Sequence, residues 1–180
     1  MVASLNHIEF FEKSKKFFEA EDIINSLENY KKVMEHFGRS DIKNKDEYIQ
    51  FLLTVLKHCE ENKKPELEAM ALRALGRTYS FFKQHAESMK YHYKSLKIQK
   101  KLGRKKETAE GLVFLAEDLE VSGNFDKIIA AFQEASNIFQ ELGKLKKVEE
   151  IKNQISRLQE FSKEIVEDEY FMNKFHVDNY

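Results

Sequence analysis

Glycine and proline are scarce in this sequence, which has six glycines and one proline among its 180 residues. Average usage of the two residue types together is roughly 12%. A β-sandwich or β-barrel needs a turn signal about every 8–12 residues, and this chain lacks the residues that supply such signals. The scarcity excludes an all-β fold, and the length fits one domain of about 100–200 residues.

Cysteine and long apolar stretches are also nearly absent. Cys59 is the one cysteine, which excludes an internal disulfide and the common multi-cysteine zinc sites. No apolar run approaches the about 18 residues that a membrane span requires. Residues 1–10 lack the basic start and the apolar stretch of a signal peptide. We therefore expect a cytoplasmic protein without a membrane span.

Charge of either sign is not in excess, since 30 basic and 31 acidic residues leave a formal net charge of −1. A dedicated nucleic-acid binder usually carries a basic surplus, because the neutralisation of phosphates supplies most of its affinity. The balance disfavours a nucleic-acid partner. Charged residues make up 34% of the chain and hydrophobic residues 42%, a combination typical of helices with one apolar and one charged face.

The few helix-breaking residues divide the chain into segments of helical length. Within them apolar residues recur at spacings of three and four, as in Leu72, Leu75 and Tyr79, which places each set on one helix face. Gly103 and Gly143 each follow a leucine and precede a basic residue, as left-handed glycines at helix C-termini do. The pattern predicts eight helices, over residues 4–19, 22–37, 46–61, 65–82, 85–102, 105–122, 125–142 and 145–167.

The sequence repeats itself at a step of 40 residues. Residues 72–79 align with 112–119, and residues 88–103 align with 128–143, with apolar or small residues at matching places. A second step reaches 152–159, where the pattern fades. A repeat of this size indicates a stacked solenoid, because one helix pair cannot bury its apolar face alone.

Two of these segments resemble a known repeat. Residues 123–138 resemble the second helix of a tetratricopeptide repeat, and residues 72–79 resemble its first helix. The family places small residues where the two helices cross; Gly76 and Ala135 match, whereas Ile128 stands where a small residue is expected. The long step is similar to that of kinesin light chains, Pins/LGN scaffolds and bacterial Rap-type peptide receptors. The resemblance implies an all-α, right-handed solenoid of antiparallel helix pairs that binds peptides or proteins, with neither a reaction nor a cofactor.

The resemblance also implies a division of the chain. We expect a single domain over residues 1–169 and a C-terminal tail over 170–180, with repeats at about 22–61, 65–102 and 105–142 and a capping helix at 145–167. The segment 21–37 also fits a second helix of a repeat, with Ser26, Tyr30 and Val33 at the matching places. The alternation of antiparallel helices favours a first helix there.

No set of residues at catalytic or metal-binding spacing stands out. No two histidines form the i, i+4 pair of a helical zinc site, and no two glycines are close enough for a phosphate-binding loop. His92 occupies the place of a phenylalanine one repeat later, which predicts structural packing, and Cys59 is predicted to be a buried small hydrophobe. Glu117, Asp118 and Glu120 are predicted to lie on a solvated face. The sequence therefore predicts neither an enzyme nor a metal site.

First helices line the groove of tetratricopeptide arrays, so the resemblance assigns partner-binding residues by position. The assigned groove residues are Arg73, Arg77, Ser80, Val113, Glu117, Glu120, Asn153 and Arg157. Glu117 lies in the middle of this set and would repel a terminal carboxylate. Its presence disfavours the chaperone-tail binding of some family members.

Basic residues also recur in the turns that join successive repeats. Stacking would align them along one edge, where they could meet an acidic partner or a nucleic-acid backbone. Cations are also favoured at helix C-termini for electrostatic reasons alone. The predicted basic edge consists of Lys63, Lys64, Arg104, Lys105, Lys106, Lys144, Lys146 and Lys147.

The sequence predicts a non-catalytic adaptor or scaffold whose groove binds a peptide or helix of a partner protein. Two alternatives stay open at this point: a peptide-sensing regulatory receptor of the Rap-like kind, and a fragment of a larger tetratricopeptide protein. A homo-oligomer that forms through the solenoid ends or the C-terminal tail is compatible with the same pattern.

Overall fold

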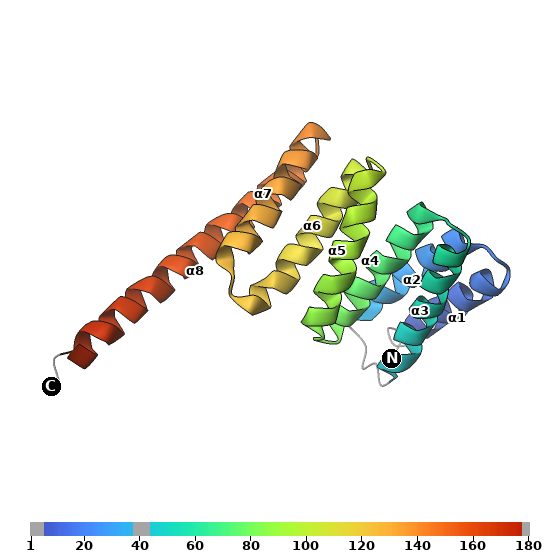
Figure 1. Cartoon of the computed structure of the whole chain (residues 1–180), viewed down its shortest axis with the longest axis horizontal. Helices are drawn as coiled ribbons and strands as arrows, with labels where there is room; N and C mark the ends of the chain where they lie inside the picture. Colours follow the sequence, from blue (N-terminus) through green and yellow to red (C-terminus); the bar gives the residue numbers. More distant parts are fainter. Residues whose placement is uncertain (1–5, 38–43, 178–180) are drawn as a thin grey trace.

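The computed structural model describes residues 6–37 and 44–177, with side chains described over residues 7–37 and 44–165. The secondary structure of these residues is entirely helical. The elements are α1 (Asn6–Glu19), α2 (Ile23–Phe37), α3 (Lys45–Glu61), α4 (Pro65–Phe81), α5 (His85–Lys101), α6 (Lys105–Leu119), the short 3₁₀ helix η1 (Glu120–Ser122), α7 (Phe125–Glu141) and α8 (Leu145–Val177). The helices follow one another along the long axis of the molecule, from α1 to α8 (Figure 1). The chain is the all-α solenoid that the sequence predicts.

The observed helix limits differ from the predicted ones mainly in the second half. The predicted helix over 105–122 ends as α-helix at Leu119 and closes with the 3₁₀ turn of η1. The last helix continues to Val177, beyond its predicted end at residue 167, and takes in most of the segment 170–180. The predicted start of the first helix at residue 4, and residues 178–180 of the predicted tail, lie outside the described residues.

Five of the described turns between helices share one hydrogen-bonded geometry. Gly103 has a φ of 67° and its N–H donates to Lys100 O, while the next N–H, of Arg104, donates to Gln99 O. These two bonds satisfy carbonyl groups that the end of the helix leaves unpaired. Gly143, with a φ of 67°, closes α7 in the same way, so both predicted left-handed glycines are confirmed.

Three further turns place a residue other than glycine in the left-handed region, which the sequence did not indicate. Glu21, Lys63 and Lys83 have φ values of 58°, 50° and 61° and make the corresponding pair of backbone bonds. A residue with a Cβ is strained in this region by roughly 1–2 kcal/mol. The geometry of the turn is therefore kept even where the preferred residue is missing.

The pairs α4/α5 and α6/α7 are in extensive contact. Gly76 of α4 allows the closest approach: a Cβ there would lie 2.7 Å from the ring of His92 on α5. Ser88 and Ser95 of α5 are both buried, and their hydroxyls donate to the backbone carbonyls of Gly76 (2.7 Å) and Ala69 (2.8 Å). Small residues and serine-to-backbone bonds therefore hold this crossing together.

The first helices pack by a mixture of two methods. The pair α1/α2 is also in extensive contact, and the buried hydroxyl of Ser14 donates to Ser26 O at 2.8 Å. Helix α3 meets α1 and α2 through aromatic rings instead: Phe51 stacks on Tyr30 with ring centroids 6.0 Å apart and meets Phe11 edge-on at 5.4 Å. Helix α2 also packs along α4. The division into repeats at 22–61, 65–102 and 105–142 with a capping helix stays a prediction.

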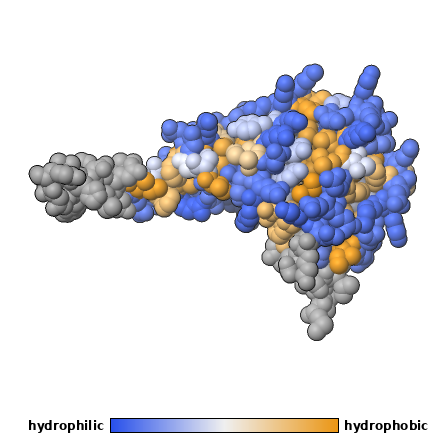
Figure 2. All heavy atoms as spheres, turned by 60° about the horizontal axis from the view of Figure 1, so that its bottom comes forward, coloured by the Kyte–Doolittle hydropathy of each residue, from blue (hydrophilic) through white to orange (hydrophobic). Residues whose placement is uncertain are grey.

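The core is divided into two clusters along the solenoid. The first is centred on α1–α4 and contains Cys59, which is fully buried as the sequence predicts, and whose pKa burial raises to about 11. The second joins α6, α7 and α8. On the face seen in Figure 2, hydrophilic residues cover much of the surface and hydrophobic residues show between them. No helix within the described parts of the chain is both long enough and apolar enough to cross a lipid bilayer.

Candidate functional site

A groove runs along the face formed by α2, α4, α6 and α8. Its largest part is a cavity of about 700 Å³ between α6 and α8, which we call the main cavity. Two smaller cavities adjoin it toward α4: the His92 cavity of about 150 Å³ and the Arg77 cavity of about 70 Å³. Phe114 of α6 lines all three, so they form one continuous surface, which we call the inner groove.

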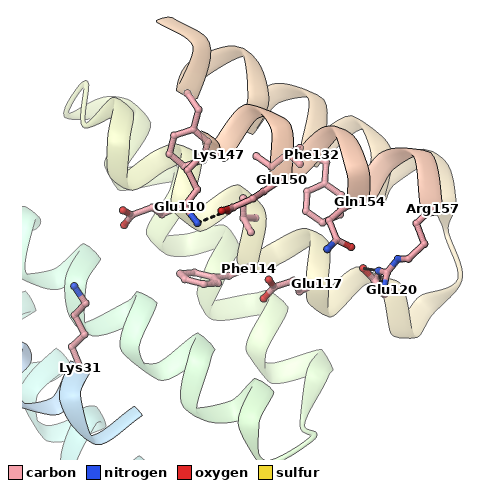
Figure 3. Close-up of a pocket in the computed structure, with 13 residues that line it drawn as sticks. Lys31, Glu110, Phe114, Glu117, Glu120, Phe132, Lys147, Glu150, Gln154 and Arg157 are labelled. Carbon is pink, nitrogen blue, oxygen red and sulfur yellow. Dashed lines mark hydrogen bonds and ion pairs between the residues drawn. The ribbon is translucent and has the colours of Figure 1, made fainter. Parts of the chain in front are cut away.

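The main cavity combines an apolar floor with a charged rim. Phe132 and Phe139 of α7 lie at its base, with Val113 of α6 and Ile151 of α8 beside them. Helix periodicity explains the arrangement, since Glu110, Val113 and Glu117 of α6 are three and four positions apart and share one face. Figure 3 shows Phe114 and Glu117 reaching in from α6 and Gln154 and Arg157 from α8. Such a surface offers apolar contacts in the centre and polar contacts at the edge.

The structure brings together most of the residues that the sequence assigned to a groove. Arg73, Arg77, Ser80, Val113, Glu117, Glu120 and Arg157 all line the inner groove. Asn153 is exposed and lines none of these cavities, whereas its neighbour Gln154 does. The step of 40 residues fades at α8, so extrapolation placed this side chain about 100° away from the cavity. A role of these residues in binding stays a prediction.

Ion pairs close much of the rim. Arg73 pairs with Glu110 across α4 and α6 at 3.0 Å. Arg157 of α8 reaches both carboxylate oxygens of Glu120, at 3.2 and 3.3 Å. Lys147 pairs with Glu150 at 2.7 Å within α8 (Figure 3). These charges already have partners inside the chain.

Arg77 and Glu117 lie in the middle of the groove without such partners. Within the described part of the chain neither side chain forms an ion pair or a hydrogen bond. The Arg77 guanidinium lies 4.0 Å from the centroid of the Phe114 ring, a cation–π contact. Both residues are exposed at the surface of the groove, but its walls remove part of their hydration. This partial burial lowers the pKa of Arg77 and raises the pKa of Glu117, and each effect is partly opposed by the charge of the other. Arg73, which lies one turn before Arg77 on α4, pairs with Glu110 and not with Glu117.

Asp118 corrects the prediction that this acidic stretch lies on a solvated face, because its side chain is 1% exposed. It accepts a hydrogen bond from His85 Nδ1 at 2.9 Å, and His92 Nε2 lies 3.4 Å from Oδ2. The single hydroxyl proton of Ser88 is shared between Gly76 O and Oδ2 of Asp118. One carboxylate of α6 thus ties together three side chains of α5, in a group that we call the Asp118 cluster.

The environment of Asp118 favours its charged form. Burial alone would raise the pKa, but contacts with His92, Ser80, Ser88 and His85 outweigh burial and lower the pKa to about 2. The repeat of the sequence carried one indication of this site. Asp118 stands 40 residues after Thr78, at the same place in the repeat, and Thr78 is also fully buried. His92 is buried, as predicted, but among polar as well as aromatic neighbours, with Phe114 at 6.0 Å between ring centroids.

The predicted basic edge is exposed but largely neutralised at its centre. Arg104 pairs with Glu107 at 2.7 Å, Lys105 with Glu141 at 2.8 Å, and Lys106 lies 3.9 Å from Glu110. Lys147 lines the main cavity and therefore belongs to the inner groove. The remaining members, Lys63, Lys64, Lys144 and Lys146, are exposed. Among the described residues, no group of three or more histidine, cysteine or acidic side chains could hold a metal ion.

Comparisons with known proteins bear on the fold. No protein-family model matches the chain, and a search of curated proteins found no significant match. Many solved structures resemble it, and three of them serve for comparison. They are BtubC (BKLC) from P. vanneervenii, with a TM-score of 0.73 and 14% identity, the STAND protein with a tetratricopeptide repeat sensor from Pyrococcus horikoshii, with 0.61 and 14%, and the apo form of RapI, with 0.50 and 11%.

The alignments cover most of this chain but less of the other proteins. They include 88% of the chain for BtubC, 93% for the STAND protein and 93% for RapI. The same alignments cover 66% of the length of BtubC, 30% of the STAND protein and 68% of RapI. At these identities the likeness concerns the arrangement of helices alone. The chain therefore has the fold of the tetratricopeptide-type α-solenoids.

Proposed function

We propose that this chain is a non-catalytic interaction module whose inner groove binds a peptide segment of another protein. The observation that carries the proposal is the continuity of the groove: Phe114 joins three cavities over four helices. Solenoids of this kind present extended surfaces of successive helices to their partners. The main cavity is large enough for bulky side chains, and its floor of Phe132 and Phe139 is apolar.

Charge distribution favours the groove over the basic edge as the binding surface. Arg104 and Lys105 of the basic edge already form ion pairs within the chain. Arg77 and Glu117 of the groove do not. Unpaired charges beside an apolar cavity can determine which ligand binds, because they interact strongly with a group that displaces water from them.

Selection from a peptide library tests the proposal. Random dodecapeptides displayed on phage are panned against the chain, and enriched peptides are measured by fluorescence anisotropy. We expect the affinity of enriched peptides to change about tenfold or more in Glu117→Lys, which reverses a charge in the groove. Glu149→Lys is the matched control, since Glu149 is an exposed glutamate of α8 that lines no cavity.

Two results would contradict the proposal. One is the failure of any peptide to be enriched against the folded chain. The other is equal binding of the enriched peptides by wild type, Glu117→Lys and Glu149→Lys, which would place the contact outside the groove. Circular dichroism on each variant verifies that the helical fold is retained.

A further inference from the structure

The Arg77 cavity contains more positive than negative charge. Lys31 of α2, Arg73 and Arg77 of α4, and Glu110 of α6 line it. Arg73 and Glu110 neutralise each other at 3.0 Å. Lys31 and Arg77 form no ion pair with any described residue. Two cations from different helices thus face one small cavity, and neither forms an ion pair with the nearby Glu110 or Glu117.

The stacking of Arg77 leaves its hydrogen-bond donors available. The guanidinium carbon of Arg77 lies 4.0 Å from the Phe114 centroid, a distance that fits stacking through the flat face of the guanidinium. Its five N–H groups lie in the plane, and none of them donates to a described residue. A carboxylate can accept two of these donors at once in the fork geometry that arginine favours.

The size of the cavity fits the same group. Its volume of about 70 Å³ leaves room for the two oxygens of a carboxylate, since a cavity of about 10–15 Å³ can already hold one water molecule. Leu27, Met34 and Met70 also line it and can contact the methylene groups of the same side chain. The main cavity continues from it along α6, with room for an apolar neighbour of the acidic residue.

We propose that the Arg77 cavity binds the side-chain carboxylate of an aspartate or glutamate within the partner peptide, held by Arg77 and Lys31. This inference rests on the proposed function and specifies the peptide that the groove selects. A side chain is favoured over a chain terminus because the Arg77 cavity adjoins both the main cavity and the His92 cavity, so that a peptide can continue in two directions. Glu117 lies near Arg77 and opposes the bound anion, so its neutralisation strengthens binding.

A change of specificity tests the inference. The phage library is panned in parallel against wild type, Arg77→Glu and Arg104→Glu, with the random segment displayed between fixed flanking sequences so that it has no free terminus. Wild type is expected to enrich an acidic residue at one fixed position beside an apolar one. Arg77→Glu is expected to enrich lysine or arginine at that position. Arg104→Glu, a matched charge reversal on the basic edge, should select the wild-type pattern.

Synthetic versions of one enriched peptide give the quantitative test. Replacing its acidic residue by the corresponding amide, or replacing Arg77 by glutamine, should weaken binding about tenfold or more, and both changes together should weaken it little further. Glu117→Gln should tighten binding. If Arg77→Glu fails to fold, Lys31→Glu at an exposed position provides the charge reversal.

Three results would overturn the inference. Enriched peptides without a fixed acidic position would overturn the inference but leave the proposed function intact, provided that Glu117→Lys changes their affinity about tenfold or more. An unchanged pattern in Arg77→Glu would also do so. Binding that requires a free C-terminal carboxylate, measured with acid and amide forms of one synthetic peptide, would assign the cavity to a chain terminus. Failure to enrich any peptide would contradict both proposals.

Discussion

The two halves of this solenoid build the same helical stack from different side chains. In the first half, from α1 to α4, aromatic rings fill the space between helices: Phe11, Tyr30, Phe37 and Tyr48 are all buried and meet one another. In the second half, small residues such as Ala135 mark the crossings, and the buried polar group is the Asp118 cluster. The fold therefore does not depend on one method of packing.

The turns of the two halves also differ, in the residue that occupies the left-handed position. The left-handed positions are Glu21, Lys63 and Lys83 in the turns from α1 to α5, and they are glycines in the turns after α5. All of these residues occupy similar φ values. The comparison indicates that tertiary packing, not the turn residue, determines where the first helices end. The following predictions test the comparison from the largest effect to the smallest.

Asp118→Asn is expected to cause the largest loss of stability. The neutral amide cannot replace the charge that faces His85, Ser88 and His92 in a buried site. Removal of one member of a buried charged network costs about 3 kcal/mol or more. Urea unfolding followed by circular dichroism measures the change. A loss below about 1 kcal/mol would mean that the Asp118 cluster is not what fixes α6 on α5.

The same variant should alter the response to acid. The pKa of Asp118 is about 2 in the folded chain against an ordinary value of 3.8, so the folded state holds the charged form more strongly. Its contribution to stability is complete above about pH 4 and is lost as the pH falls toward 2. The stability difference between wild type and Asp118→Asn should therefore shrink over this range. A constant difference would contradict the role of the charge.

Gly76→Leu tests the close crossing of α4 and α5. Even the Cβ of an alanine at this position would lie 2.7 Å from the buried His92 ring, so a larger side chain must push the helices apart. Overpacking of this kind costs about 1–3 kcal/mol, and Ala135→Leu, at a fully buried position of α7, should behave alike. Thermal unfolding measures both. Two variants that melt like the parent would show that small residues do not define the crossings.

Tyr30→Phe tests the contact between α2 and α4. The Tyr30 hydroxyl hydrogen-bonds Thr78 Oγ1 at 3.1 Å, and both residues are fully buried. Burial also raises the pKa of this phenol. Loss of the bond leaves Thr78 without its partner and should cost about 1 kcal/mol. Tyr93→Phe, at a side chain that is 52% exposed, is the control and should leave chemical unfolding unchanged.

Lys83→Gly should stabilise the chain slightly. Glycine removes the strain of the left-handed backbone at φ 61°, a gain of about 0.5–1 kcal/mol after its entropic cost is subtracted. Gly103→Ala should destabilise the chain instead, because alanine is strained at the positive φ of 67°. Nothing lies within 4 Å of the added Cβ, so no steric clash contributes to this loss. Differential scanning calorimetry resolves shifts of this size. Equal signs for the two variants would contradict the interpretation of the turns.

The sequence predicted the helices well because each apolar stripe and each breaker acts locally. The turns at Gly103 and Gly143 and the burial of Cys59 followed from residue type. Asp118 did not, since a carboxylate in an amphipathic helix ordinarily faces water and its partners come from another helix. The pairing of Arg73 with Glu110 depended on the distance between helices, which no local pattern contains. The fold was thus accessible from the sequence, and the polar details of the groove were not.

The length of α8 has a mechanical consequence. Helix α7, against which it packs, has 17 residues, whereas α8 has 33. At 1.5 Å per residue, the last 16 residues extend about 24 Å beyond the length that α7 matches. Figure 1 shows this end projecting from the stack. Because the N-terminal part of α8 forms one wall of the main cavity, a tilt of about 10° on occupation of the groove would displace the far end by about 4 Å. A helix of this length would convert a small movement at the cavity into a larger one at its tip.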